Sequence, residues 1–412
     1  MANGDSTRKV GLVLSGGGAF GAYEVGAIKA LYSGQSPATA SAPLDPDVFS
    51  GTSVGNFNAA VLAMNKGGAQ ASAKRLHDIW TNDVADNDDG RGNGVYRMRG
   101  NPADYLDPRV PGGPLELFQR IFGDATTFGG FAARRAWKFF FGEGRQLHRA
   151  ANFVDVSLLL DIDPFEKLVR NSIDPTALRE SPKDLRVEAT NWTTGKAEAF
   201  RFQNVNRTDD ETWHIIRASA AIPCLFPPVK MLSTYFIDGG VVMNTPIKPA
   251  IDRGATEIHV VILDPTVAEL PRGYAENTWD AFNRVYMAMM AAKITADIVS
   301  AESVNKGIDI IERAAAGEID AGDAKRFLGT AKLILGKLEA EGSLPRKLTI
   351  HRYYPKRPLG GMLGMLNFHR PAIDALIEEG YNDVLAHNCG DNKCVIPQAV
   401  KAAQSAAAGS QT

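Results

Sequence analysis

The sequence Phe49-Ser50-Gly51-Thr52-Ser53-Val54-Gly55-Asn56 decides the fold of this 412-residue chain. Val48 and Phe49 are typical of the end of a buried strand, and the apolar run from Ala59 to Met64 is typical of a helix. A serine at a sharp turn between strand and helix, in the pattern G-x-S-x-G, is the nucleophile-elbow arrangement. The glycines on either side leave room where the two backbones come close. We therefore expect the Ser53 hydroxyl to project beside a helix N-terminus, whose N–H groups favour negative charge.

A second strand-to-helix turn lies near the N-terminus. Lys9 to Leu14 predict a buried strand, and Ala22 to Tyr32 have the apolar spacing of a helix. Between them, Gly16, Gly17 and Gly18 can turn several backbone N–H groups toward one point, as in an anion-binding nest. If both turns lie at one edge of a parallel sheet, these glycines are placed to form an oxyanion hole for the serine.

The same glycines, Gly16-x-Gly18-x-x-Gly21, also match a dinucleotide-binding fingerprint. That fingerprint requires a second strand that ends in an acidic residue about 20 residues beyond the glycines. Here the region from Gln35 to Asp47 is a loop rich in Pro, Ser and Ala, and its acidic residues precede the next strand. The oxyanion-hole interpretation fits the sequence better.

Composition narrows the function classes. The chain is 44% hydrophobic and 22% charged, as in an ordinary globular protein with a sizeable core. A net charge of -2 argues against nucleic acid as a partner. We find no signal peptide and no apolar run near the roughly 20 residues that span a bilayer. The three cysteines are too few for a disulfide framework, although Cys389 and Cys394 are close enough to pair. We expect a cytoplasmic protein, with peripheral membrane contact left open.

We expect a catalytic domain over residues 8–270, with a lid or cap insertion at about 82–150. Residues 271–412 are expected to form a mostly helical C-terminal extension, with a disordered tail from about 402. Within the insertion, residues 128–141 are aromatic and basic, and on a helix they separate into a basic face and an apolar face. That pattern suits either a membrane surface or a cap over a pocket.

Further elements are predicted from periodicity and from turn and capping residues. The strands are expected at 186–191 and 196–202 as a hairpin, and at 229–237, 258–263 and 347–353. The helices are expected at 70–80, from Asp163-Pro164 onward, at 211–221 behind a cap at 208–210, and at 278–303, 321–341 and 372–386.

A nucleophilic serine needs a base, and the sequence offers two kinds. A Ser–acid–His order would use a histidine late in the chain, such as His351 or His369, but neither lies in a context that singles it out. Asp238 instead follows a strand and precedes two glycines, which places a carboxylate on a sharp turn at a strand end. We see no clustered spacing of metal ligands and expect neither a metal ion nor a cofactor.

Four blocks in this order resemble the patatin-like phospholipase family: 16–21 (GGGAFG), 51–55 (GTSVG), 218–223 (ASAAIP) and 238–240 (DGG). The resemblance covers about residues 8 to 265. It implies a three-layer α/β/α fold with a mainly parallel central sheet. It also implies that Ser53 and Asp238 form a catalytic Ser–Asp dyad. By the same resemblance, Gly16, Gly17 and Gly18 form the oxyanion hole, supported by the other motif glycines Gly21, Gly51, Gly55, Gly239 and Gly240.

The resemblance implies a lipid acyl hydrolase that cleaves phospholipids, lysophospholipids or other acyl lipids through an acyl-enzyme. Acyl transfer by the same dyad and a non-catalytic membrane-surface protein on this fold are the alternatives. One position departs from the family, which often has Arg or Lys where this chain has Phe20. We expect the hydroxyl proton of Ser53 to pass directly to Asp238. Apolar neighbours such as Phe226 and Phe236 would raise the pKa of this carboxyl group.

Overall fold

The computed structural model describes residues 8–86, 93–98, 160–203, 205–223, 225–263, 346–357 and 364–397, with short pieces at 284–285, 288, 298–299, 301–310, 313 and 359. Most of the expected insertion at 82–150 lies outside these residues, as does all of its aromatic and basic segment at 128–141. The helix expected at 321–341, most of the one at 278–303, Cys224 and the tail from 402 also lie outside them.

The strands and helices follow the chain in alternation at first, as a parallel sheet requires. The strands are β1 (Val10–Leu14), β2 (Val48–Thr52), β3 (Arg97–Met98), β4 (Leu160–Asp161), β5 (Asp184–Asn191), β6 (Ala197–Arg201), β7 (Val229–Met231), β8 (Thr234–Asp238), β9 (Glu257–Val261) and β10 (Thr349–Tyr353). The α-helices are α1 (Gly21–Tyr32), α2 (Val54–Ala63), α3 (Ala69–Ile79), α8 (Asp163–Ser172), α9 (Pro175–Glu180), α10 (Asp209–Ser219), α11 (Ile247–Asp252) and α15 (Arg370–Leu385). Short helical turns are η1 (Gly18–Phe20), η2 (Pro37–Thr39), η3 (Trp80–Val84) and η5 (Gly239–Val241).

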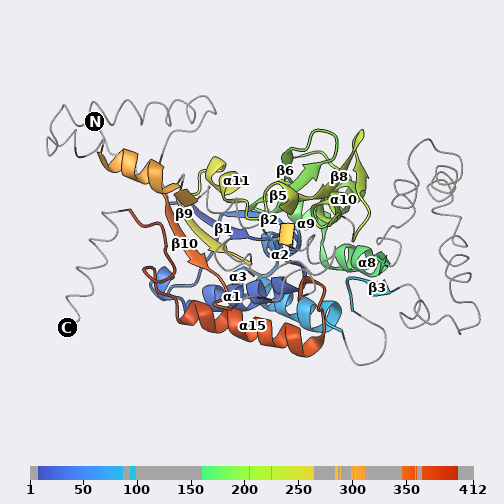
Figure 1. Ribbon diagram of the computed structural model, residues 1–412, viewed down its shortest axis with the longest axis horizontal. Coiled ribbons are helices and arrows are strands. Elements are labelled where there is room, and N and C mark those ends of the chain that lie inside the picture. The colour runs from blue at the N-terminus through green and yellow to red at the C-terminus, as the bar shows by residue number, and fades with distance from the viewer. Residues whose placement is uncertain are drawn as a thin grey trace, which may run out of the picture.

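One mainly parallel sheet forms the centre of the molecule (Figure 1). Its strands lie in the order β10-β9-β1-β2-β5-β8-β7, and β6 also pairs with β5. The five strands from β10 to β5 are parallel to their neighbours, whereas β6, β7 and β8 add antiparallel pairs at the other end. Because β1 and β2 are neighbours, the two strand-to-helix turns that follow them lie side by side, as the sequence predicts.

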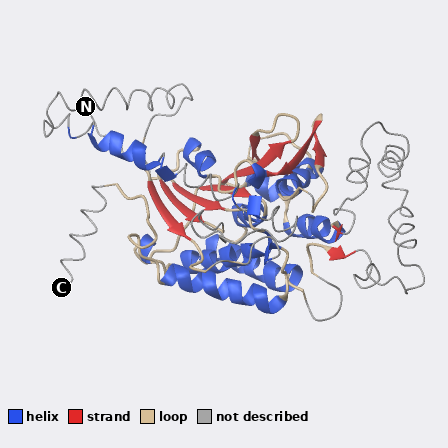
Figure 2. Cartoon of the chain, viewed as in Figure 1, coloured by secondary structure: helices blue, strands red, loops and turns tan. Residues whose placement is uncertain are grey.

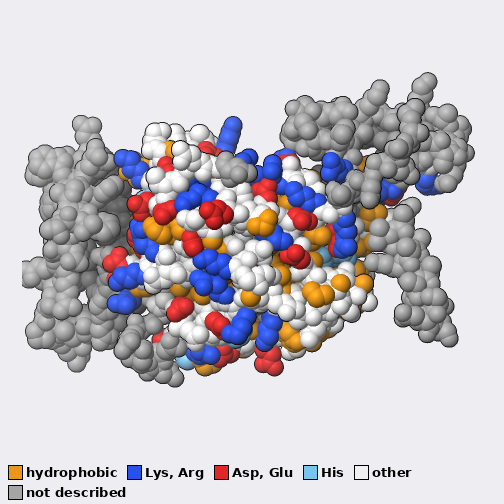
Figure 3. All heavy atoms as spheres, turned by 180° about the vertical axis from the view of Figure 1, so that it is seen from behind, with side chains coloured by type: hydrophobic (Ala, Val, Ile, Leu, Met, Phe, Trp, Pro, Cys, Tyr) orange, Lys and Arg blue, Asp and Glu red, His pale blue; other side chains and the backbone are white. Residues whose placement is uncertain are grey.

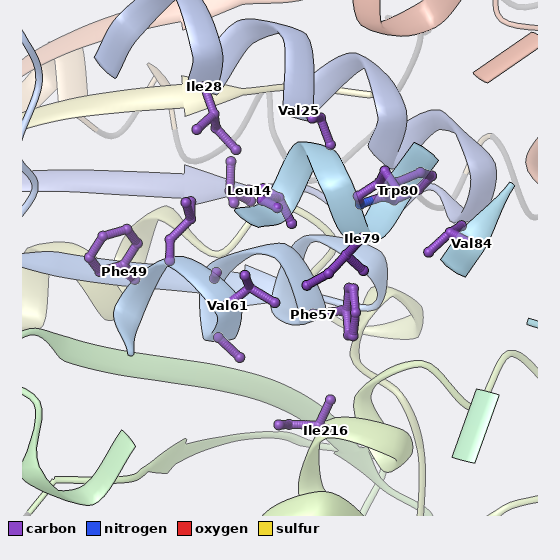
Figure 4. Packing of buried hydrophobic residues seen from close by; sticks show 14 of the residues in the cluster. Leu14, Val25, Ile28, Phe49, Phe57, Val61, Ile79, Trp80, Val84 and Ile216 are labelled. Carbon is purple, nitrogen blue, oxygen red and sulfur yellow. The ribbon is translucent and has the colours of Figure 1, made fainter. Parts of the chain in front are cut away.

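Alternate side chains of the central strands point into two separate cores, one on each face of the sheet. Leu12 and Leu14 pack into the larger core, which α1, α2 and α3 cover. Val13 points the other way and joins a smaller core with residues of α11, such as Ile247 and Ala250. Figure 2 shows helices on both sides of the sheet, and Figure 4 shows the larger core around Phe57 and Trp80. The expected three-layer α/β/α arrangement is confirmed.

The predicted single strand at 229–237 is wrong, because the structure divides it into β7 and β8. The two strands pair antiparallel around a tight turn at Leu232, which has a φ of 55°. Leu232 is 77% exposed, so its apolar side chain extended the strand pattern without belonging to a core. The division matters because β8 runs back along β5 and places Asp238 beside Ala189.

Two elements near the C-terminus complete the same fold. The predicted strand at 347–353 is confirmed as β10, which pairs in parallel with β9 at the edge of the sheet. The predicted helix at 372–386 is confirmed as α15, which lies along α1 (Figure 1). Both elements come from the stretch expected to form the C-terminal extension, so part of it packs into the same cores as residues of 8–270.

The described surface mixes charges of both signs. On the face seen in Figure 3, Lys and Arg side chains lie among Asp and Glu side chains. The described residues of that face therefore present no continuous basic surface. Among the residues that the structure describes, none of the helices is long and apolar enough to cross a bilayer.

Candidate active site

Ser53 occupies a strained turn between β2 and α2. Its φ of 54° and ψ of -126° lie where residues other than glycine are rarely found. Such strain persists only when the surrounding structure enforces it. A Cβ atom added at Gly51 would lie 2.5 Å from the carbonyl oxygen of Gly55, which shows how closely strand and helix approach. The predicted elbow is present, and it brings Ser53 to the end of β2 with only 4% of its surface exposed.

The C-terminal end of α10 and the residues directly after it hold this turn in place. The backbone N–H of Ser53 donates a hydrogen bond of 3.0 Å to the Oγ of Ser219, which is fully buried. The backbone N–H of Asp238 donates to the carbonyl of Ala221 at 2.9 Å. One short segment therefore holds both Ser53 and Asp238. The sequence pattern predicts no role for Ser219, because nothing in it indicates where the hydroxyl points.

Asp238 is the last residue of β8 and is 1% exposed. Its Oδ1 accepts a hydrogen bond of 2.7 Å from the backbone N–H of Gly240, which fixes the orientation of the carboxyl group. Its carbonyl oxygen accepts a bond of 2.9 Å from Thr190 Oγ1 on β5. Its Oδ2 has no well-formed hydrogen bond within the described part of the chain. One carboxyl oxygen is thus held in place while the other remains available.

Burial dominates the ionisation of Asp238. Loss of contact with water raises the pKa of this carboxyl group to about 7. Interaction with the Ser53 hydroxyl and the hydrogen bond from Gly240 act in the opposite direction, but they are smaller. A carboxyl group with a pKa near 7 is a far better proton acceptor at neutral pH than an ordinary aspartate.

The glycine loop after β1 lies against Ser53. A Cβ atom added at Gly16 would lie 3.0 Å from the Cβ of Ser53. The Gly16 N–H already donates to the carbonyl of Asn244 at 3.1 Å. Among the described residues, the N–H groups of Gly17 and Gly18 make no hydrogen bond. These two are the donors of the loop that remain available to a ligand.

A pocket lined almost wholly by apolar side chains opens beside Ser53. Phe57 of α2 and Trp80 of η3 form part of its wall, and Figure 4 shows both of them in the larger core. Met365 and Phe368 form another part, from the segment that precedes α15. A chain region far beyond the expected domain end at 270 therefore completes the pocket.

The histidines considered as bases lie elsewhere. His369 precedes α15 and is exposed, and His351 lies on β10 beside His387. Neither lines the pocket, and neither contributes to the pKa shift of Asp238. The structure thus brings Ser53 together with Asp238, and it leaves these two histidines outside the site.

Two other sequence features have structural explanations. Phe20, at the position where the resemblance suggests a basic residue, is 4% exposed and packs in the larger core against Gly364. Asp47 precedes β2, and its Oδ2 accepts from the N–H of Val10 at 2.8 Å, at the start of β1. That is the opposite end of the strands from the glycine loop, so Asp47 is not placed to bind a ribose in a dinucleotide site.

Comparisons with known proteins bear on the family of the chain. The sequence profile described as patatin-like phospholipase matches residues 12–251. Lysophospholipase NTE1 from two serotype D strains of Cryptococcus neoformans is 33% identical over 99 residues. That alignment covers 23% of this chain and 6% of each fungal protein, so the chain spans a small part of these relatives.

Among solved structures, VipD from Legionella pneumophila aligns with 92% of this chain and 67% of its own, at 15% identity and a TM-score of 0.34. The profile match spans more than half of the sequence and contains both strand-to-helix turns and Asp238. On that match, the chain belongs to the patatin-like phospholipase family.

Proposed function

We propose that the protein is a lipid acyl hydrolase in which Ser53 and Asp238 form the catalytic dyad. The observation that carries the proposal is the buried Asp238 carboxyl group, which lies beside a serine on a strained turn. Its Oδ1 is held by a hydrogen bond, and its Oδ2 has no well-formed hydrogen bond among the described residues. The family of the chain supports action on lipid esters, and the curated relatives it matches are lysophospholipases by name.

In the proposed reaction, Ser53 Oγ attacks the ester carbonyl carbon and its proton passes to Asp238 Oδ2. The resulting tetrahedral intermediate breaks its bond to the alcohol oxygen, and that oxygen leaves with the proton from Asp238. Water then attacks the acyl-enzyme while Asp238 takes its proton. The bond to Ser53 Oγ breaks, Asp238 returns the proton to that oxygen, and the fatty acid is released. A dyad suffices because the pKa of Asp238, raised to about 7 by burial, lets one carboxyl group act as base and as acid.

The negative charge of the intermediate needs fixed donors. We assign this role to the N–H groups of Gly17 and Gly18, which have no other partner among the described residues. Gly16 instead shapes the loop, because its N–H is occupied by Asn244. Removing one such donor from an enzyme typically costs about 3 kcal/mol in transition-state stabilisation.

The pocket supports an acyl chain as the group bound beside Ser53. Apart from Ser53 and Gly18, every side chain that lines it is hydrophobic. Burying one methylene group contributes about 0.8 kcal/mol, so such a wall favours longer chains until the pocket is full. A polar acyl group would find no partner along this wall.

The test is ester hydrolysis by the purified full chain. The substrates are p-nitrophenyl esters of increasing chain length and a mixed phospholipid, with release of free fatty acid measured without added acceptor. Ser53→Ala and Asp238→Asn should each lower kcat by about three orders of magnitude or more, as expected for residues that act as a unit. Ser72→Ala is the matched control, because Ser72 is a buried serine on α3 outside the pocket.

The outcomes separate the alternatives. Loss of hydrolysis in both variants, with the control active and all proteins folded, supports the dyad. Activity in Asp238→Asn near that of the wild type would overturn Asp238 as the base. Product that forms only when a lysolipid or glycerol is added would indicate acyl transfer instead of hydrolysis.

A further inference from the structure

Four side chains that commonly bind metals meet at the edge of the sheet, outside the pocket. His351 comes from β10, and His387, Cys389 and Cys394 come from the segment that follows α15. One nitrogen or sulfur atom from each lies within 4.8 Å of the others. Both histidines are buried, and both cysteines are partly buried and free of disulfide bonds.

The distances within this cluster match those of a tetrahedral zinc site. The Sγ of Cys389 lies 3.5 Å from His351 Nδ1 and 3.6 Å from His387 Nε2. The Sγ of Cys394 lies 3.5 Å from the same His387 Nε2. Zinc bonds of about 2.3 Å to sulfur and about 2.0 Å to nitrogen, at tetrahedral angles, place these atoms about 3.6 Å apart.

Hydrogen bonding alone explains the arrangement less well. His387 Nε2 carries at most one hydrogen atom, yet it faces two sulfur atoms at nearly equal distances. A cation at the centre would instead contact one lone pair of each of the four atoms. Two cysteine thiolates would balance the charge of a divalent ion, so the bound site would be neutral and tolerate burial.

We propose that His351, His387, Cys389 and Cys394 bind one structural zinc ion through His351 Nδ1, His387 Nε2 and the two Sγ atoms. Two thiolates and two imidazoles in tetrahedral arrangement favour zinc among the common metals. Four protein ligands leave no open position for a substrate, which is typical of structural sites and unlike catalytic ones.

The surroundings of the cluster hold its ligands in place. The backbone N–H of Arg352 donates to the Sγ of Cys394 at 3.4 Å, and the N–H of Cys394 donates to the carbonyl of Cys389 at 2.9 Å. On β9, His259 stacks on His351 with ring centroids 4.9 Å apart. Hydrogen bonds around metal ligands orient them in known sites.

The zinc ion would hold the segment that follows α15 against β10 at the edge of the sheet. Beside the cluster, Ile350 and Val395 exchange two backbone hydrogen bonds of 2.8 and 2.9 Å. This short contact covers β10, which is the edge strand. The helix between the ligands, α15, directly follows the segment that contributes Met365 and Phe368 to the pocket. Binding of the metal would therefore stabilise the part of the fold that carries this wall.

The direct test is the metal content and thiol count of the purified wild-type chain. After exchange into chelator-treated buffer, elemental analysis should find about one zinc ion per chain, as a closed four-ligand site requires. Denaturation in chelator should then expose all three cysteine thiols. Absence of zinc with three thiols would overturn the proposal in favour of a hydrogen-bonded cluster. Absence of zinc with two fewer thiols would overturn it in favour of a disulfide.

Variants locate the ion without reliance on enzyme activity. Cys389→Ser and His387→Gln should lose the zinc, whereas His369→Gln, an exposed histidine outside the cluster, should keep it. Ser53→Ala should also keep it, so failure of the ester-hydrolysis proposal would not affect this one. If the ligand variants do not fold, the wild-type protein can be loaded with cobalt and its absorption spectrum recorded. Visible bands of tetrahedral cobalt together with a sulfur-to-cobalt charge-transfer band would support the site. Octahedral cobalt or no binding would contradict it.

Discussion

The Oγ of Ser219 accepts a hydrogen bond of 3.0 Å from the backbone N–H of Ser53, at the point where the chain turns sharply between β2 and α2. Ser219 touches no other part of the proposed machinery through its side chain among the described contacts. Its hydroxyl holds the backbone of a residue whose φ is 54°. Ser219 is thus a positioning residue for the turn.

Replacement of Ser219 by Ala should leave the N–H of Ser53 buried and unpaired. Such a loss costs about 1–3 kcal/mol in stability. We expect a lower free energy of unfolding in denaturant titrations and a lower kcat with little change in KM, because the pocket is untouched. Ser72→Ala is the control, since the Ser72 hydroxyl is buried but has no hydrogen-bond partner among the described residues. Equal effects of the two substitutions would show that Ser219 does not position Ser53.

Hydrolysis should depend on the ionisation of Asp238. The carboxyl group accepts a proton only when it is deprotonated, and burial raises its pKa to about 7. We therefore expect kcat/KM to rise with pH and to level off above about pH 8, falling about tenfold per unit well below the pKa. The rate should be followed with a chromophore whose signal does not change with pH. If kcat/KM did not change between about pH 5 and about pH 8, this carboxyl group would be excluded as the base.

The same ionisation should cost stability. The pKa of Asp238 in the folded protein, about 7, lies above its ordinary value of 3.8. Protonation is therefore favoured by folding, and the stabilising effect is lost as pH rises between these values. Asp238→Asn avoids this loss. At about pH 8 its free energy of unfolding, measured by denaturant titration, should therefore exceed that of the wild type by up to about 4 kcal/mol.

Below about pH 4 the two proteins should be equally stable, because Asp238 is then protonated in both states. Glu188 on β5 is also buried, and desolvation raises its pKa to about 7 as well. It is present in both proteins, so the difference between them still isolates Asp238. A constant difference at all pH values would point to packing as its cause.

Gly18 should tolerate no side chain. Its φ is 56°, and an added Cβ atom would collide with the carbonyl oxygen of Met365. Gly195, in the hairpin between β5 and β6, has a similar φ of 64° but no atom within 4 Å of an added Cβ. Gly195→Ala should therefore lower stability only by the strain of a residue with a Cβ atom in the left-handed conformation, about 1–2 kcal/mol, and activity should be unchanged. Gly18→Ala should cost more and should lower kcat strongly.

Thermal unfolding and ester hydrolysis of the two glycine variants test this comparison together. A similar loss of stability in both, with full activity in Gly18→Ala, would show that the loop can move away from the segment at Met365 without effect on the reaction.

The sequence predicts local elements well where periodicity and capping residues agree. The strand before Gly16 and the helix behind the cap at Thr208 both form, and Thr208 makes the full capping box with Glu211. Asp163 was expected as the N-cap residue with Pro164 first in the helix, but the helix begins at Asp163 and Ile162 occupies the N-cap position. The turn at Leu232 was missed because an exposed leucine continues an apolar pattern.

Long-range contacts were harder to predict than elements. β10 and α15 were expected, but their places beside β9 and α1 depend on residues more than 80 positions away. For the same reason, the contact of Ser219 with Ser53 and the wall formed by Met365 could not be inferred from spacing. The four ligands of the proposed zinc site were also missed, since His351 lies far in sequence from the other three.

The most direct measurement of the central claim is labelling of the folded protein with a fluorophosphonate, followed by peptide mapping. Activated serines react with this probe, and ordinary serines do not. The proposed dyad predicts a single adduct on Ser53, no adduct in Ser53→Ala, and much slower labelling in Asp238→Asn. An adduct on another serine, no labelling of folded wild-type protein, or equal rates for wild type and Asp238→Asn would contradict it.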